Sequence, residues 1–388
     1  MARKRETVDQ DFAARLLPGE KPTLRTLARL SGFAVATVSR ALSDAPDIGD
    51  NTKNLVKHIA EAVGYVPNRA GVRLRTGKTN VISLLLPMTD EETNIFYTII
   101  IRSISAEFLG TPYHLNVTPF FAAGDSLLPV QRIVENGLAD GIIMNQIEPE
   151  DPRVAYLLEH QFPFATHGRS KWREQHAYFD FDNHAYVWDA MRKLKDRGRS
   201  SVLLLAPPLT QTYAQDMLRA LTEAGKELSM AVRSIERPIE KTQGVESPVA
   251  FAAAIAQELA RAPHIDAVIA ASIDAGLTAA QAVERVKGVV GDTIDVWTKE
   301  LQPFLTNFRP DILTTFENAS PAGTFLARAV QNAIAHPSGP PLQKLVGPED
   351  LYGLALSSTL KFHLDENCYT YEIADQRTRD FSGAISRR

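Results

Sequence analysis

The sequence predicts an α/β protein that begins with a small all-helical head. Residues 22–66 contain three helix-length amphipathic stretches, whereas from residue 80 onward short apolar runs alternate with helical patterns. Continuous apolar strands between helices are typical of parallel sheets that are covered on both faces. A length of 388 residues allows two or three domains. We therefore expect a helical head followed by two parallel sheets in tandem, which form two lobes and bind a ligand beyond the carboxyl ends of their strands.

The charge is divided between these two parts. Residues 1–80 carry 14 Lys and Arg against 8 Asp and Glu, a net charge of +6, and since the whole chain has −4, the remaining residues carry −10. A basic head on an acidic body is typical of a DNA-binding module joined to a domain with another task. Residues 1–21 are expected to form a mobile basic arm, in which Arg3, Lys4 and Arg5 could contact phosphates or have no role.

Residues 23–42, TLRTLARLSGFAVATVSRAL, have the pattern of two short helices joined by a tight turn. Thr23 is a suitable N-cap, because its hydroxyl can accept hydrogen bonds from the free backbone N–H groups of the first helix. Gly32 allows the positive φ of a sharp corner, and Val35, Val38 and Leu42 resume helical spacing after it. The outer face of the second helix then carries residues suited to DNA, since small side chains allow close approach, hydroxyls can bind phosphates and an arginine can bind a guanine edge: Ala34, Ala36, Thr37, Ser39 and Arg40. An ordinary helical hairpin would show a similar pattern.

A third amphipathic helix is expected over residues 51–63, NTKNLVKHIAEAV, ending before Gly64. Its inward residues should be Leu55, Val56, Ile59, Ala60 and Val63. The short basic segment GYVPNRAGVRLRTGKTN follows. With VATVSRAL before GYVPNRA and LRTGKTN, residues 23–80 resemble the DNA-binding head and hinge of the LacI family of bacterial transcriptional repressors.

The resemblance implies a DNA-binding role for particular residues. Residues 22–66 would be the helix-turn-helix domain and residues 67–79 the hinge. Gly71 stands where the family usually has Ala, and since a Gly inside a helix costs about 0.5–1 kcal/mol, the hinge should be less helical without DNA. The expected DNA-binding residues are the N-cap Thr23, the base-reading Val35, Ala36 and Arg40, the phosphate-binding Thr37 and Ser39, the start of the hinge helix at Asn68 and Arg69, and Leu74 as a minor-groove wedge.

The body, from residue 80 to the end, is expected to contain nine strands. They lie at 81–87, 113–120, 141–146, 163–168, 177–182, 201–207, 267–272, 293–299 and 312–318. GLADGIIMNQ, FPFATHGRS, FDFDN, DRGRSSVLLLAPP and PDILTTFENASPAGTFLARAV resemble the periplasmic-binding-protein-like effector domain of the same family. The resemblance implies one lobe at about 80–183 and 317–345, and another at about 184–316 and 346–388. This domain would also form the homodimer.

The same resemblance implies a polar effector site between the lobes. Phe96 offers an aromatic face for a sugar ring, Arg169 a guanidinium for hydroxyls, and Asp182 with Asn183 directional hydrogen bonds. Two departures from the family pattern follow: Tyr213 stands where an arginine is common, and Ser272 with Asp274 replaces an Asn-Asp pair. The effector, a sugar or related polyol, is therefore not expected to be a standard hexose.

The sequence gives little support for nucleotide binding, glycoside hydrolysis or a metal site. GVRLRTGKT has five residues between its glycines, one more than a phosphate-binding P-loop, and precedes a strand. Asp180 and Asp182 would face the same side of one strand, which leaves no partner across a glycosidic bond. The histidines lack metal-ligand spacing and the single cysteine, Cys368, excludes an internal disulfide, so we expect no metal or other cofactor and a reducing cytoplasm.

The sequence also shows no apolar stretch long enough to span a membrane and no signal-peptide core. The expected function is that of a cytoplasmic, homodimeric transcriptional regulator, a repressor of a carbohydrate-related operon, which binds double-stranded operator DNA and is controlled by a small effector. The alternative is a sugar-binding protein or sugar enzyme with a vestigial head.

Overall fold

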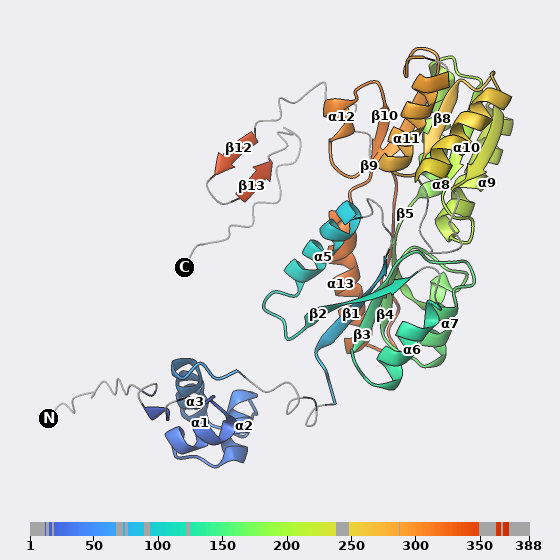
Figure 1. Ribbon diagram of the computed structural model, residues 1–388. Coiled ribbons are helices and arrows are strands. Elements are labelled where there is room, and N and C mark those ends of the chain that lie inside the picture. The colour runs from blue at the N-terminus through green and yellow to red at the C-terminus, as the bar shows by residue number, and fades with distance from the viewer. Residues whose placement is uncertain are drawn as a thin grey trace, which may run out of the picture. The chain divides into compact units, whose positions relative to one another are not determined.

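The computed structural model of the protein divides into two compact units, Met1–Asn80 and Val81–Arg388, here called the head and the body (Figure 1). The structure describes residues 12, 15–17, 19–66, 73, 77–88, 94–121, 125–237, 248–286, 288–348, 362–365 and 368–371.

The head contains three helices, α1 (Leu24–Ser31), α2 (Val35–Leu42) and α3 (Asp50–Ala62). Thr23 is the N-cap of α1, as predicted: its hydroxyl accepts a hydrogen bond from the backbone N–H of Thr26 at 3.2 Å, and Thr26 Oγ1 accepts one from the N–H of Thr23 at 3.1 Å. Gly32 ends α1 at a φ of 74°, and Gly64 follows α3 at a φ of 65°. Both glycines therefore occupy the left-handed region that the turns require.

One prediction for α3 is wrong. Leu55 was expected to face inward but is 40% exposed, whereas Val56, Ile59, Ala60 and Val63 are buried. The buried positions follow the i, i+3, i+4, i+7 spacing of a single helical stripe, and residue 55 lies beside that stripe.

The first lobe of the body is built on a six-stranded parallel sheet. Its strands, in spatial order, are β11 (Gln343–Val346), β5 (Ala177–Phe181), β4 (Phe164–His167), β3 (Gly141–Met144), β1 (Val81–Met88) and β2 (His114–Phe121). Helices α5 (Asn94–Glu107) and α13 (Ser320–Ala335) cover one face, and α6 (Leu127–Glu135) and α7 (Pro152–Glu159) cover the other (Figure 1). A 3-10 turn, η2 (Arg173–Gln175), precedes β5.

The second lobe repeats this design with a five-stranded parallel sheet. Its strands are β10 (Leu313–Phe316), β9 (Asp295–Glu300), β8 (Ala267–Ala270), β6 (Ser201–Ala206) and β7 (Ala231–Glu236). Its helices are α8 (Asn183–Asp196) and α9 (Thr212–Glu227) on one face, α10 (Pro248–Arg261) and α11 (Ile273–Val286) on the other, and the short α12 (Leu305–Phe308).

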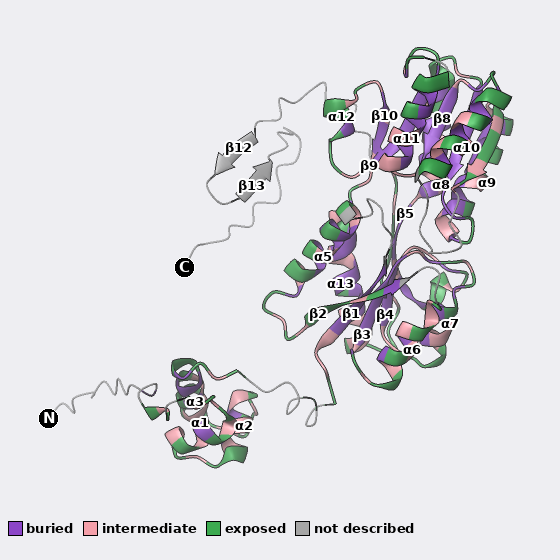
Figure 2. Ribbon diagram, in the orientation of Figure 1, coloured by how far each residue is buried: buried purple, intermediate pink, exposed green. Residues whose placement is uncertain are grey.

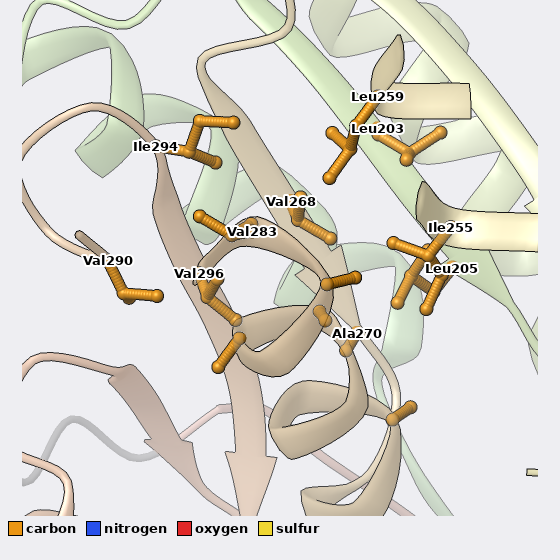
Figure 3. Packing of buried hydrophobic residues seen from close by; sticks show 14 of the residues in the cluster. Leu203, Leu205, Ile255, Leu259, Val268, Ala270, Val283, Val290, Ile294 and Val296 are labelled. Carbon is orange, nitrogen blue, oxygen red and sulfur yellow. The ribbon is translucent and has the colours of Figure 1, made fainter. Parts of the chain in front are cut away.

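Apolar side chains fill the space between sheets and helices. In the second lobe, Leu203, Val268 and Val296 project from three strands against Ile255 of α10 and Val283 of α11 (Figure 3). Figure 2 shows the result in the body: the inner strands of the two parallel sheets are buried, and the exposed residues lie mainly on the outer sides of the helices and on edge strands. Burial of the strands on both faces explains why their sequences are continuously apolar.

All nine predicted strands are present, and four strands of the structure were not predicted: two at sheet edges and two in the C-terminal segment. β7 (AVRSIE) and β11 (QKLV) are sheet edges whose side chains remain largely exposed, so they lack the apolar run that marked the others. The C-terminal segment contributes an antiparallel pair, β12 (Phe362–Asp365) and β13 (Cys368–Tyr371). Within the described residues, no helix has the length and apolar character that a membrane span requires.

Candidate DNA-reading face and effector site

The exposed face of α2 carries the residues that sequence analysis assigned to DNA. Val38 and Ala41 are fully buried in the head core, while Ala36 and Arg40 on the other side are exposed and Thr37 and Ser39 are half-buried. Val35 was grouped by its spacing with the inward residues, but it is 41% exposed. It therefore lies on the outer face, where the family resemblance had placed a base-reading residue.

The side chain of Arg40 forms an ion pair with Asp47, which lies in the loop between α2 and α3. The same loop is joined to α3 by Asp44, whose carboxylate accepts a hydrogen bond from Lys57 Nζ at 2.6 Å. That hydrogen bond is the largest of the effects that lower the pKa of Asp44. Exposed ion pairs of this kind contribute about 0–1 kcal/mol, so the pair can orient the Arg40 guanidinium without preventing it from binding another acceptor.

The hinge residues Asn68, Arg69 and Leu74 lie outside the described residues, as does Gly71.

In the body, Arg169 connects the two lobes. It follows β4 of the first lobe, and its Nε donates to Asp180 Oδ2 of β5 at 2.7 Å. Its Nη2 donates to Asp216 Oδ2 at 3.1 Å, and Asp216 lies in α9 of the second lobe. A second contact joins the lobes nearby, because the backbone N–H of Thr212 at the start of α9 donates to the carbonyl of Ile147 at 2.9 Å.

Burial and neighbouring charges change the pKa values of Asp180 and Arg169. Burial raises the pKa of Asp180 to about 6, although the Arg169 guanidinium opposes the shift. For Arg169, burial lowers the pKa, but the carboxylates of Asp180 and Asp216 outweigh it, and the net effect is a raised pKa. Arg169 is therefore a permanent cation, and the charge of Asp180 can change near neutral pH.

Lys299, near the end of β9, forms the centre of a second polar group. Its Nζ donates to Asn183 Oδ1 at 2.9 Å and forms an ion pair with Glu317 at 2.8 Å. The same ammonium lies 4.9 Å from the ring centroid of Phe181 and 5.9 Å from that of Tyr213. Asn183 and Glu317 lie where the chain passes between the two sheets, so this group also joins elements of both lobes.

An aromatic pair lies on the first-lobe side. The ring of Phe96 is 5.0 Å from that of His167, edge to face. Burial lowers the pKa of His167 to about 4, and the charges of Glu317 and Lys299 also act on it. In the adjacent position of α5, Tyr97 accepts a hydrogen bond at its hydroxyl from Asn145 Nδ2 at 3.0 Å, and Oδ1 of Asn145 is buried without a partner.

The remaining predicted effector residues have mainly local contacts. Asp182 is the N-cap of α8 and accepts from the N–H of Ala185 at 2.9 Å, so it lies beyond the end of β5. The expectation that Asp180 and Asp182 alternate along one strand is therefore wrong, because β5 ends at Phe181, one residue before the end of the predicted strand. Asp274 forms an ion pair with Arg237 at 2.6 Å, and the carbonyl of Ser272 accepts from Thr298 Oγ1 at 2.7 Å.

Several polar residues of these clusters were not predicted, among them His167, Asn145, Asp216, Lys299 and Glu317. Four of these five stand at or just after the carboxyl end of a predicted strand, which is the position where ligands bind in doubly wound sheets. That signal could have identified them. Asp216 lies within a helix, and only the fold brings it to Arg169. Among the described residues, no group of His, Cys, Asp and Glu could hold a metal ion.

Residues 23–68 match the family "Bacterial regulatory proteins, lacI family". The HTH-type transcriptional regulator AglR of Rhizobium meliloti (strain 1021) is 28% identical over 331 residues, which cover 83% of this chain and 90% of AglR. Residues 23–68 therefore form a LacI-family head, and the chain as a whole is similar to an HTH-type transcriptional regulator.

Other similar proteins are also transcriptional regulators. The regulator RafR of Escherichia coli is 34% identical over 211 residues, 52% of this chain and 62% of RafR. The lac repressor dimer bound to operator and the anti-inducer ONPF has a TM-score of 0.70 at 17% identity, covering 85% of this chain and 97% of that one. The CelR–cellobiose complex has a TM-score of 0.58 at 22% identity, covering 85% and 98%. The structural likenesses establish the fold, and the sequence relatives identify the chain as a DNA-binding transcriptional regulator.

Proposed function

We propose that this LacI-family regulator is a repressor whose binding to operator DNA is controlled by a small polar effector held between the two lobes. The observation that carries the proposal is the position of Arg169, whose guanidinium binds one carboxylate from each lobe. A ligand that replaces one of these contacts changes the relative stability of two lobe orientations, and this difference in stability is what allows a ligand to shift a conformational equilibrium.

On the DNA side, two copies of the chain form a homodimer, and their α2 helices enter successive major grooves of a pseudo-palindromic operator. Val35, Ala36 and Arg40 contact base edges, while Thr37 and Ser39 bind phosphates and Thr23 holds the start of α1. Asn68 and Arg69 begin a hinge helix, which places Leu74 in the minor groove between the two half-sites.

On the effector side, the ligand is a sugar or related polyol. Phe96 supplies an aromatic face, while Arg169, Asp182 and Asn183 supply hydrogen bonds, with Tyr213, Ser272 and Asp274 on the side of the second lobe. A structurally similar protein supports this class of ligand, since the structure of CelR is that of a complex with cellobiose. The ion pairs of Arg169 and Lys299 leave the described clusters rich in carboxylates, which favours a neutral ligand over an acidic one.

The test is the affinity of the purified protein for DNA fragments from upstream of its own gene, measured at several salt concentrations. Neutral mono- and oligosaccharides, polyols and sugar phosphates are added in turn. Tight binding to a palindromic site that one neutral sugar shifts would support the proposal. Binding that stays nonspecific with every compound would contradict it.

One variant distinguishes the contribution of the hinge to DNA binding from that of the head. Leu74→Ala should weaken binding to the operator while leaving salt-driven nonspecific binding largely unchanged, because a minor-groove wedge acts only at a site that is kinked. Equal losses in both kinds of binding would contradict the wedge.

A further inference from the structure

A segment before the family motif packs on the DNA-binding head. The family match begins at residue 23, yet Phe12 is only 4% exposed and belongs to the same hydrophobic core as Leu27, Val38 and Ile59. Half-buried Leu16 packs against this core as well. A phenylalanine in a free arm would be exposed, so this part of residues 1–21 does not form the mobile arm that the sequence suggested.

The surroundings of Phe12 are specific. Its ring meets that of His58 of α3 edge to face, with 6.1 Å between the centroids. On another side, the guanidinium carbon of Arg15 lies 5.7 Å from the centroid of the Phe12 ring. Both arrangements are favourable for an aromatic ring. Each stabilises the Phe12 ring beyond the gain from burying its apolar surface.

Glu20 joins the same segment to the start of α1. One carboxylate oxygen accepts from Thr26 Oγ1 at 2.8 Å, and the other accepts from Arg29 Nη2 at 2.7 Å and from the backbone N–H of Leu17 at 3.0 Å. The N–H of Leu17, followed by Thr26 and Arg29, lowers the pKa of Glu20. Arg29 Nη1 also donates to the carbonyl of Arg15 at 3.2 Å.

Thr26 connects this network to the helix-turn-helix motif, because it is also the partner of Thr23 in the capping box of α1. Glu20 therefore holds the first turn of α1, the helix that precedes α2 in the helix-turn-helix motif. Residues 23–66 alone would be close to the size below which a domain cannot bury enough apolar surface to fold independently, about 40 residues. Because the head is close to this size limit, the apolar surface that Phe12 and Leu16 add to its core contributes to its stability.

We propose that the upstream residues Phe12, Arg15, Leu16 and Glu20 are an integral part of the DNA-binding head, in which Phe12 and Glu20 are positioning residues for α1 and α2. Phe12 completes the core behind α2, and Glu20 fixes the first turn of α1. Operator binding by this chain then depends on a segment that lies outside the family motif.

The first test is hydrogen exchange of the full-length protein with and without Phe12→Ala. We expect amides within α1–α3 to exchange about 100-fold faster or more, because deleting a buried phenylalanine side chain destabilises the unit that contains it. Amides of β6 and β8 in the body should keep their rates, which makes them an internal control. Unchanged exchange in α1–α3 would overturn the proposal.

The second test measures DNA binding. The probe is operator DNA selected from random duplexes with the wild-type protein, and sheared nonspecific DNA is the competitor. Glu20→Ala should lower the ratio of operator to nonspecific affinity about tenfold, since the loss of the two charge-assisted hydrogen bonds from Glu20 to Thr26 and Arg29 leaves α1 misplaced. Phe12→Leu, which keeps an apolar side chain in the core, should retain most of the affinity that Phe12→Ala loses. An unchanged ratio in Glu20→Ala would overturn the positioning role, and exposed Leu17, changed to Ala, is the matched control.

Discussion

Removing the guanidinium of Arg169 tests the contact between the lobes. In Arg169→Met the carboxylates of Asp180 and Asp216 lose the cation that lies between them at 2.7 and 3.1 Å. Breaking a buried ion pair costs about 3–5 kcal/mol, and since the Arg169 side chain is 15% exposed, we expect about 3 kcal/mol at pH 8.

The loss should depend on pH. Asp180 has a folded-state pKa that burial raises to about 6, so its contribution to stability is fully present below its unfolded pKa and is lost as the pH rises through about 6. Without Arg169 the pKa rises further, and each additional unit costs about 1.4 kcal/mol at high pH. The loss in Arg169→Met should therefore be smaller at pH 5, where Asp180 is largely protonated in both proteins.

Urea unfolding followed by tryptophan fluorescence measures this effect, because the three tryptophans, Trp172, Trp188 and Trp297, all lie in the body. In the double variant Arg169→Met with Asp180→Asn, most of the pH-dependent part of the lost free energy of unfolding should be regained. Arg219→Met is the matched control: Arg219 also contacts Asp216, at 2.8 Å, but its side chain is 59% exposed, so its loss should stay below about 1 kcal/mol. Equal losses at pH 5 and pH 8 in Arg169→Met, or no rescue by Asp180→Asn, would refute the reasoning.

Three further predictions concern other sites. His167→Gln should reduce the loss of stability that the wild type shows as the pH falls from 6.5 toward 4, by at most about 3 kcal/mol, because burial lowers the folded-state pKa of His167 to about 4; urea unfolding across this range with an unchanged profile would contradict it. Asp295→Asn should cost about 3 kcal/mol at pH 7, measured by the same unfolding assay, since the buried carboxylate accepts from Arg197 and Arg199 at 2.8 Å each; a loss below 1 kcal/mol would show that the pair is dispensable. Arg40→Ala should cost about 1–3 kcal/mol of operator affinity and relax the preference at one base pair, as competition with single-base variants of the operator would show; an unaltered base preference would exclude Arg40 as a reader.

The sequence determined the elements whose cause is local. Thr23 and Gly32 define the ends of α1 because a hydroxyl cap and a positive φ are properties of single residues and their immediate neighbours. The buried strands were found because burial on both faces demands a continuous apolar run. The edge strands β7 and β11 were missed for the same reason, since an edge needs no such run.

The tertiary structure decided which distant side chains meet. Arg169 was predicted as a site residue from the family resemblance, but its partner Asp216 is 47 residues away in a helix of the other lobe. Phe12 carries no local signal of burial, and only the packing of α1 and α3 creates the space that it fills. Local sequence sets backbone conformation through short-range sterics and hydrogen bonds, whereas ion pairs and core contacts between remote residues exist only after the chain has brought them together.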